Sequence, residues 1–420
     1  MSLSKFTVLV LLVCLSPGSL HAQKKPQPIP AGYDFPAVES ALLKFRDTGD
    51  VDGMRRHAWL VFAGMTQPTS TGEAVWETWY SGSETFGAAQ PQALAERKLQ
   101  RKFQVPRQFR ESGLHPQAIG ASLASITLFD EELRTFVRQN KLYLRSTLKS
   151  INDAFPSQTP VEKREIAEFP NRAIALKTVW WIIKRQGLTV MPVWDPALNP
   201  TIPEGNDFPT WKRCVAVDPS RTTIPAGESK TSTCNQSLSS AVAVVPLDSF
   251  YHFPLTAEDV SALRDLNVFI PNLDETTTAG DYLALVALHY TTKEIRDWVW
   301  ATFWWHDKPN DGSFAANRPS EVKGVWRNYL MDISYSMDSP TASDGGPHAA
   351  FNPWLEARFR SGTVSNCMTC HRRSVFSGRS SDQVFRPVTR GTPAPDDPRF
   401  GGATKLDFLW SVLLESLPDR

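Results

Sequence analysis

Apolar side chains with helical spacing dominate the first third of the chain. Between residues 38 and 65 they recur at intervals of three and four, and a polar stretch at residues 47–53 predicts a turn between two helices. A charged segment at residues 93–105 and an amphipathic segment at residues 130–152 predict two more helices. We therefore predict a mainly helical region over residues 37–168.

The pattern changes near residue 169, where β-branched and aromatic residues become frequent. Residues 173–183 form a nearly continuous apolar run, which is typical of a buried strand. Further strands of this kind are expected at residues 188–194, 214–217, 241–247, 282–291 and 298–305. We predict that residues 169–319 form a β-rich region.

The last hundred residues return to helical patterns in short pieces. Short helices are expected at residues 320–331 and 353–359, and an amphipathic helix is expected at residues 404–417. Together these patterns predict an α+β fold with a helical N-terminal third, a β-rich, sandwich-like centre and a short, mostly helical C-terminal segment over residues 320–420.

The beginning of the chain has the layout of an export signal. Lys5 precedes an apolar run at residues 6–15, and a polar break then leads to the small residue Ala22. This pattern predicts a signal peptide over residues 1–22, followed by a Pro-rich linker over residues 23–36. A lipid-anchored alternative on Cys14 lacks the small preceding residue that such sites need, because Val13 stands there. We expect a periplasmic or secreted protein without a membrane span.

Composition narrows the classes of partner. The formal net charge is +1 without a long run of one sign, so we expect no nucleic-acid binding. The 14 Trp residues predict large aromatic cores or an aromatic-lined pocket, and such a pocket would suit a small-molecule ligand of the large β-rich region.

The remaining cysteines form two pairs of different character. Cys214 and Cys234 flank a Pro-, Gly-, Ser- and Thr-rich stretch, which predicts a disulfide closing a loop. Cys367 and Cys370 stand in the sequence C-M-T-C-H, which ends at His371. Two alternatives stay open for these residues: a zinc site built from all four cysteines and His371, and a thioredoxin-like redox pair at Cys367 and Cys370.

The C-x-x-C-H spacing is suited to covalent attachment of haem. Two thiols separated by two residues can add to the vinyl groups of one porphyrin edge, and the following histidine can reach the iron. Over residues 352–420 the chain resembles the c-type cytochrome family, on Cys367, Cys370, His371 and the terminal amphipathic segment. The resemblance implies one covalent haem c, with His371 as the proximal iron ligand and electron transfer as the function.

A looser likeness extends over much of the chain to bacterial secreted proteins described as cytochrome c family. Four segments carry it: W-E-T-W at residues 76–79, W-A-T-F-W-W-H at residues 300–306, N-P-W-L-E at residues 352–356 and S-N-C-M-T-C-H at residues 365–371. This likeness implies haem binding and export, and it implies no particular reaction.

The second axial ligand departs from the family pattern. The usual ligand in c-type cytochromes is a Met downstream of the motif, but no Met follows His371. A sixth ligand must therefore come from an earlier part of the chain or be missing. The candidates are Met337 and Met331, which we favour, then His348 and His306, with more remote histidines at His57, His115, His252 and His289.

Two groups of side chains could extend the haem site. His306 ends a Trp-rich predicted strand and is either a ligand or an acid–base group near haem, or a turn residue of the core. Several arginines follow the motif and could pair with haem propionates, dock an acidic redox partner or serve solubility alone: Arg372, Arg373, Arg379, Arg386, Arg390 and Arg399. The favoured function is electron transfer to a redox partner still to be identified. The alternatives are a peroxidase- or oxygenase-type haem enzyme and a haem-based sensor with an open iron site.

Overall fold

The computed structural model describes residues 25–87, 101–105, 122–199, 207–235, 239–356, 361–378 and 390–417. The predicted signal peptide, most of the helix expected at residues 93–105, and Arg379 and Arg386 lie outside the described residues.

The described part of the N-terminal third contains five α-helices. The two helices predicted within residues 38–65 are confirmed as α1 (Glu39–Thr48) and α2 (Val51–Met65). Gly49 ends α1 in a left-handed conformation with φ of 67°, and the Asp50 side chain caps α2 by accepting a hydrogen bond from the Gly53 N–H. The prediction of a single helix at residues 130–152 is wrong, because a turn divides this segment into two helices. The remaining helices of this third are α3 (Gly82–Phe86), α4 (Glu131–Gln139) and α5 (Arg145–Ala154).

All six predicted apolar runs form strands among the described residues, and seven further strands were not predicted; the mixture of helices and mostly antiparallel strands confirms the α+β class. The described strands are β1 (Tyr80–Ser81), β2 (Ala124–Phe129), β3 (Ile174–Ile183), β4 (Thr189–Val193), β5 (Arg213–Asp218), β6 (Ser229–Thr233), β7 (Ser239–Pro246), β8 (His252–Pro254), β9 (Tyr282–Thr292), β10 (Val299–Trp305), β11 (Tyr329–Ser334), β12 (Val375–Phe376) and β13 (Thr404–Lys405). The helix α6 (Ala257–Arg264) interrupts the β-rich region.

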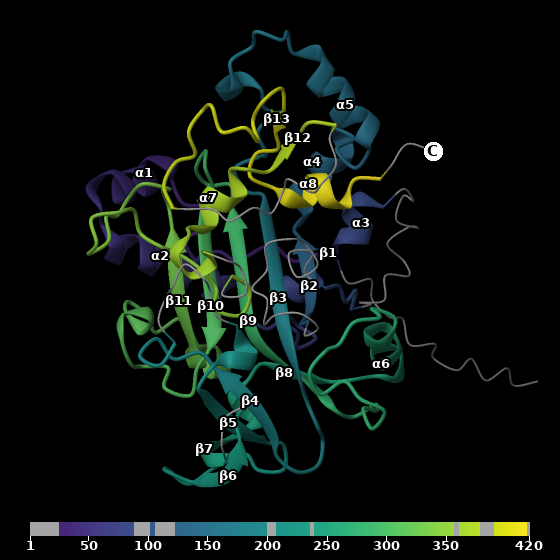
Figure 1. Ribbon diagram of the computed structural model, residues 1–420, viewed down its shortest axis with the longest axis vertical. Helices are drawn as coiled ribbons and strands as arrows, with labels where there is room; N and C mark the ends of the chain where they lie inside the picture. Colours follow the sequence, from purple (N-terminus) through teal and green to yellow (C-terminus); the bar gives the residue numbers. More distant parts are fainter. Residues whose placement is uncertain are drawn as a thin grey trace, which may run out of the picture.

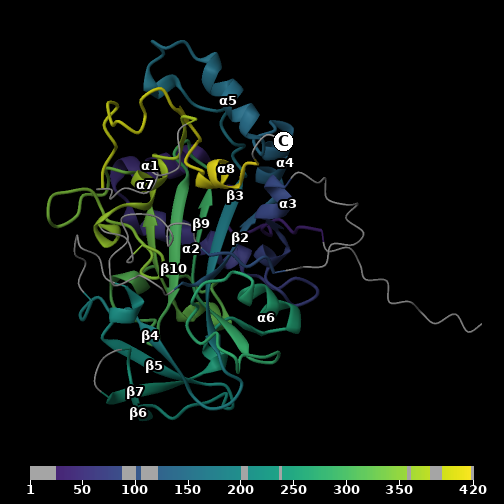
Figure 2. The same cartoon turned by 45° about the vertical axis from the view of Figure 1, so that its right-hand side comes forward.

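These strands form a large sheet and two smaller ones. The seven-stranded sheet is antiparallel, with the order β1-β2-β3-β9-β10-β11 and with β8 paired to β9. The four-stranded sheet has the order β4-β5-β7-β6, and β12 pairs with β13. In Figures 1 and 2 the four-stranded sheet lies beyond the lower end of the seven-stranded sheet, so the β-rich centre consists of two sheets placed end to end rather than stacked layers.

The helical third and the large sheet share one hydrophobic core. The Phe303 ring of β10 stacks on the Phe62 ring of α2, with a centroid distance of 4.1 Å, and the Tyr290 hydroxyl of β9 donates a hydrogen bond to the Ala58 carbonyl at 2.7 Å. Because side chains alternate along a strand, the neighbours of Phe303 point to the opposite face. That opposite face is covered by the C-terminal segment, which carries α7 (Cys367–His371).

The C-terminal segment is less helical than the sequence predicts. Residues 320–331 form a 3₁₀ helix (Gly324–Asn328) that leads directly into β11, because β11 completes the large sheet beside β10. Residues 353–356 form a turn, and residues 357–360 lie outside the described part. The expected helix at residues 404–417 is confined to α8 (Trp410–Glu415), because residues 404–405 pair with β12 instead.

The predicted disulfide is confirmed. Cys214 of β5 is bonded to Cys234, which follows β6, with Cα atoms 5.6 Å apart. The bond joins an inner strand to the edge strand of the four-stranded sheet and excludes both cysteines from the alternative zinc site.

Candidate functional site

The C-M-T-C-H motif forms the short helix α7 against the large sheet. Asn366 caps this helix: its side-chain oxygen accepts hydrogen bonds from the Met368 N–H and from the Ser334 hydroxyl of β11, both at 2.9 Å. The Asn366 amide also donates to the His348 carbonyl at 3.1 Å. The cap therefore fixes the start of α7 to the end of β11 and to the preceding loop.

His371 is held as a neutral imidazole with one nitrogen left for another partner. Its Nδ1 lies 2.8 Å from the Phe408 carbonyl oxygen, and since a carbonyl only accepts, Nδ1 carries the proton. The ring packs on Trp300 of β10, with a centroid distance of 4.2 Å. Burial lowers the pKa of His371 to about 4. Metal-bound histidines usually donate their second N–H to a carbonyl or carboxylate in this way, so His371 fits an iron ligand through Nε2.

The orientation of the Phe408 carbonyl depends on two consecutive residues with positive φ. Asp407 and Phe408 both adopt left-handed conformations, with φ of 46° and 67°. The buried Asp407 carboxylate accepts hydrogen bonds from Lys293 Nζ at 2.7 Å and from Trp298 Nε1 at 3.2 Å. These contacts hold a conformation that non-glycine residues rarely adopt, and they place the Phe408 carbonyl against His371.

The two thiols of the motif are unpaired, in contrast to Cys214 and Cys234. Burial raises the pKa of Cys367 well above its ordinary value and raises the pKa of Cys370 to about 11. Thiol–disulfide oxidoreductases depend on a thiolate with a lowered pKa. The surroundings of Cys367 and Cys370 therefore disfavour the redox-pair alternative.

A row of polar side chains crosses the sheet face that supports α7. The strand register places Lys177 of β3 opposite His289 of β9, His289 opposite Thr302 of β10, and Thr302 opposite Asp332 of β11. Directly paired residues point to the same side of a sheet. Trp300, two residues before Thr302, shares this face, so the polar row lies one step along the strands from the Trp300 contact with His371.

The loop before the motif closes over this row. The Asn352 amide donates to the Thr302 hydroxyl at 2.7 Å, and His348 Nε2 lies 3.0 Å from Asp332 Oδ1. The negative charge of Asp332 raises the pKa of His348. Two strands and the C-terminal segment are thereby joined by side-chain contacts across the site.

Six side chains define what we call the polar recess: Lys177, His289, Glu356, Cys367, Cys370 and His371. Their charges act on one another, and burial is the main cause of the pKa shift of each, lowering the pKa of Lys177 to about 8, raising that of Glu356 to about 7 and lowering that of His289. Yet each of the six is only half-buried. The surrounding protein therefore desolvates these side chains while part of their surface stays accessible, and the name polar recess is used for this group of six.

The structure brings some of the candidate sixth ligands to the motif and not others. Met337 packs in the same apolar cluster as Met368, and His348 contacts Asp332 beside the motif. Met331 instead belongs to the core on the opposite face of the sheet, with α2. His306 lies six residues beyond Trp300 along β10, which at the rise of an extended strand is about 20 Å. Met331 and His306 are therefore not placed to reach an iron on His371.

His306 has a structural environment of its own. Its Nδ1 accepts a hydrogen bond from the Lys308 N–H at 2.9 Å, in a turn next to Asp307 and Arg213. This environment agrees with the turn-residue interpretation of His306.

The described arginines after the motif are engaged with acidic side chains of the same chain. Arg372 pairs with Glu165 at 3.2 Å, and Arg373 pairs with Asp397 at 3.1 Å. Arg399 also lies beside Asp397, and Arg390 pairs with Asp344. These pairs position the segment around α7, and the predicted roles toward propionates or a partner stay predictions.

The sequence predicts three members of the polar recess as site residues, Cys367, Cys370 and His371, and places His289 among the remote candidate ligands. It gives no role to Lys177 and Glu356. For Lys177 and His289 the available signal is a charged or imidazole side chain within a strand that is otherwise apolar, since such residues are seldom buried without a partner.

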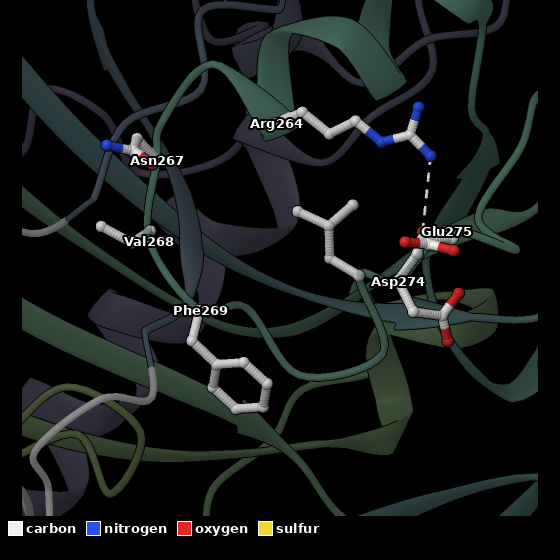
Figure 3. A pocket seen from close by; sticks show the side chains of 7 residues that line it. Arg264, Asn267, Val268, Phe269, Asp274 and Glu275 are labelled. Atoms are coloured by element: carbon white, nitrogen blue, oxygen red, sulfur yellow. Dashed lines mark hydrogen bonds between the residues drawn. The ribbon is translucent and has the colours of Figure 1, made fainter.

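A second concavity lies on the surface after α6. Figure 3 shows its lining, with the Arg264 side chain directed toward the backbone of Asp274, whose carbonyl accepts a hydrogen bond at 3.4 Å. The pocket has a volume of about 650 Å³, and Phe269 at its edge is 63% exposed. The Arg264 guanidinium also donates to the Thr277 carbonyl, so its role is to hold the loop, and we assign no ligand to this pocket.

Comparison with known proteins gives no relative: no family model, no curated protein and no solved structure matches the chain. Within the part of the chain that the structure describes, no three His, Cys, Asp or Glu side chains are grouped to hold a metal ion. No helix among those residues is long and apolar enough to cross a membrane.

Proposed function

We propose that this chain is an exported, mono-haem c-type cytochrome-like protein that transfers electrons. Haem is attached covalently to Cys367 and Cys370, and His371 is the proximal iron ligand. The observation that carries this proposal is the state of His371 within the motif: Nδ1–H donates to the Phe408 carbonyl and leaves Nε2 for a metal. A bound haem supplies a one-electron iron couple.

The protein side of this function is to hold and shield the cofactor. Trp300 and the Phe408 carbonyl fix the plane and tautomer of the His371 ring, and a fixed hydrogen bond to the ligand tunes the iron. The two thiols, unpaired and three residues apart on one helix, are available for thioether formation. The other half-buried side chains of the polar recess lie beside them.

Export is the second part of the proposal. The disulfide between Cys214 and Cys234 supports it, since such bonds persist in oxidising compartments outside the cytoplasm. Attachment of haem c also takes place outside the cytoplasm, so both cysteine pairs agree with the periplasmic or secreted location predicted from residues 1–22.

The polar recess favours a second candidate function. Lys177, His289 and Glu356 are protonatable groups beside the motif, which suits a haem enzyme or sensor whose iron has an open position. Carbon monoxide separates the two candidates: an iron that binds it readily has an open position, whereas an iron that resists it has two strong protein ligands.

The test of the proposed function is covalent haem retention. The full-length chain is produced with and without a c-type haem maturation system, denatured, separated by electrophoresis and stained for haem peroxidase activity. We expect staining of the matured wild type, none in Cys367→Ala/Cys370→Ala, and wild-type staining in the matched control Cys214→Ala/Cys234→Ala. An unstained wild type beside a stained cytochrome control would overturn the proposal.

A further inference from the structure

One histidine of the polar recess, His289, makes no side-chain hydrogen bond among the described residues, and the strand register fixes its position. His289 lies in the middle of β9, where its neighbours from Leu283 to Leu288 are apolar and buried. Among the described residues its ring has no hydrogen-bond partner, although it is paired across the sheet with Lys177 and Thr302. Its half-buried imidazole is therefore free to bind a further ligand.

The position of His289 is fixed relative to the motif. Thr302, its neighbour on β10, is two residues from Trp300, and the Trp300 ring contacts the His371 ring at 4.2 Å. Asn352, from the loop before the motif, reaches Thr302 from the same side. His289 and His371 therefore face one space, and their charges act on each other.

We propose that His289 supplies the sixth axial ligand to the iron held by His371. This inference rests on the proposed haem function, and it assigns the position that a Met occupies in most c-type cytochromes to a histidine of β9. A ligand on the central strand of a seven-stranded sheet is rigidly placed, which suits electron transfer because the coordination need not change between the two oxidation states.

The neighbouring candidates are less suitable for reasons visible in the structure. His348 already uses Nε2 toward Asp332 at 3.0 Å. Met337 is 7% exposed, and its side chain is part of the apolar cluster that also contains Met368. Lys177 shares the recess but has electrostatic partners there, including Glu356.

The experiment compares matured wild type with single variants by absorption, electron paramagnetic resonance and carbon monoxide binding. We expect the wild type to be low-spin with bis-histidine signatures and to resist carbon monoxide. His289→Ala should keep its covalent haem, become high-spin and bind carbon monoxide rapidly, and added imidazole should restore the low-spin spectrum. The matched controls His348→Ala and Met337→Leu should behave as the wild type does.

The outcomes separate this inference from the function on which it rests. Covalent haem with an unchanged low-spin spectrum in His289→Ala overturns the assignment of His289 alone. A high-spin wild type that binds carbon monoxide also overturns it and favours the enzyme or sensor function. A wild type without covalent haem overturns both proposals. If His289→Ala does not fold, the near-infrared spectra of the wild type and of His348→Ala decide together. A bis-histidine band in both supports His289, whereas a histidine–methionine band in the wild type, or loss of the bis-histidine band in His348→Ala, overturns the assignment.

Discussion

Replacing Asp407 with Asn should destabilise the protein strongly while leaving its shape unchanged. Asp407 is 2% exposed, and its carboxylate accepts hydrogen bonds from Lys293 Nζ at 2.7 Å, from Trp298 Nε1 at 3.2 Å and from the Phe169 N–H at 3.0 Å. Asn has nearly the same volume and tolerates the left-handed backbone at this position. The substitution therefore removes the charge and, because the amide NH2 cannot accept, the hydrogen bond that Oδ2 accepts from the Phe169 N–H.

The expected loss in the free energy of unfolding depends on Lys293, which stays buried when the charge of Asp407 is removed. Lys293 is 3% exposed, and removing one member of a buried ion pair costs about 3–5 kcal/mol, because the other charge stays buried. Lys293 also donates to the Arg296 carbonyl at 2.6 Å, so the loss is partly compensated. We expect the free energy of unfolding to fall by about 3 kcal/mol, at the lower end of that range.

The assay is urea unfolding followed by tryptophan fluorescence. The matched control is Asp153→Asn, which breaks the exposed pair with Lys149 and should change the free energy of unfolding by less than about 0.5 kcal/mol. The double variant Lys293→Met/Asp407→Asn should recover most of the loss, because no charge is then stranded. A loss of less than about 1 kcal/mol in Asp407→Asn would refute the reasoning, since the remaining acidic neighbour of Lys293, Glu168 at 3.9 Å, is 47% exposed and compensates a buried ammonium poorly.

Three further predictions concern other parts of the structure. Replacing Cys214 and Cys234 by Ala should lower the free energy of unfolding by about 3 kcal/mol in urea titrations, since the bond closes a loop of 20 residues; an unchanged midpoint would contradict this. Asn366→Ala removes the cap of α7 and should lower the free energy of unfolding by about 1 kcal/mol. It should also reduce the yield of covalent haem on stained gels, whereas Asn366→Asp should retain the cap. Asp332 raises the pKa of His348, so this pair should contribute stability below pH 6.5 that is lost as pH rises through the folded-state pKa. His348→Gln should abolish that part of the pH dependence, and identical pH profiles of the two proteins would exclude the pair as its source.

The sequence alone predicts the cofactor-binding motif, but it does not predict which side chains of the sheet lie beside that motif. The spacing of Cys367, Cys370 and His371 suggests one cofactor because these residues lie on a single helical turn, whose geometry is independent of the rest of the fold. Lys177 and His289 lie in separate strands, and only strand register places them opposite each other. Register depends on the pairing of whole strands, so the residues around Lys177 or His289 alone do not predict that the two are paired.

The elements show the same division between local pattern and tertiary context. The apolar runs of β3, β9 and β10 predicted strands correctly, because burial on both faces of a sheet leaves a continuous run of this kind. The terminal segment has leucines at helical spacing, yet its first residues pair with β12, and Asp407 and Phe408 adopt left-handed backbone. The sequence by itself determined the motif, the disulfide and the six strands that have apolar runs. Only the tertiary structure decided that the Phe408 carbonyl accepts the hydrogen bond of His371 and that His289 lies on the same side of the sheet as His371. Such contacts join distant segments of the chain, and they outweigh the small free energies of local helix propensity.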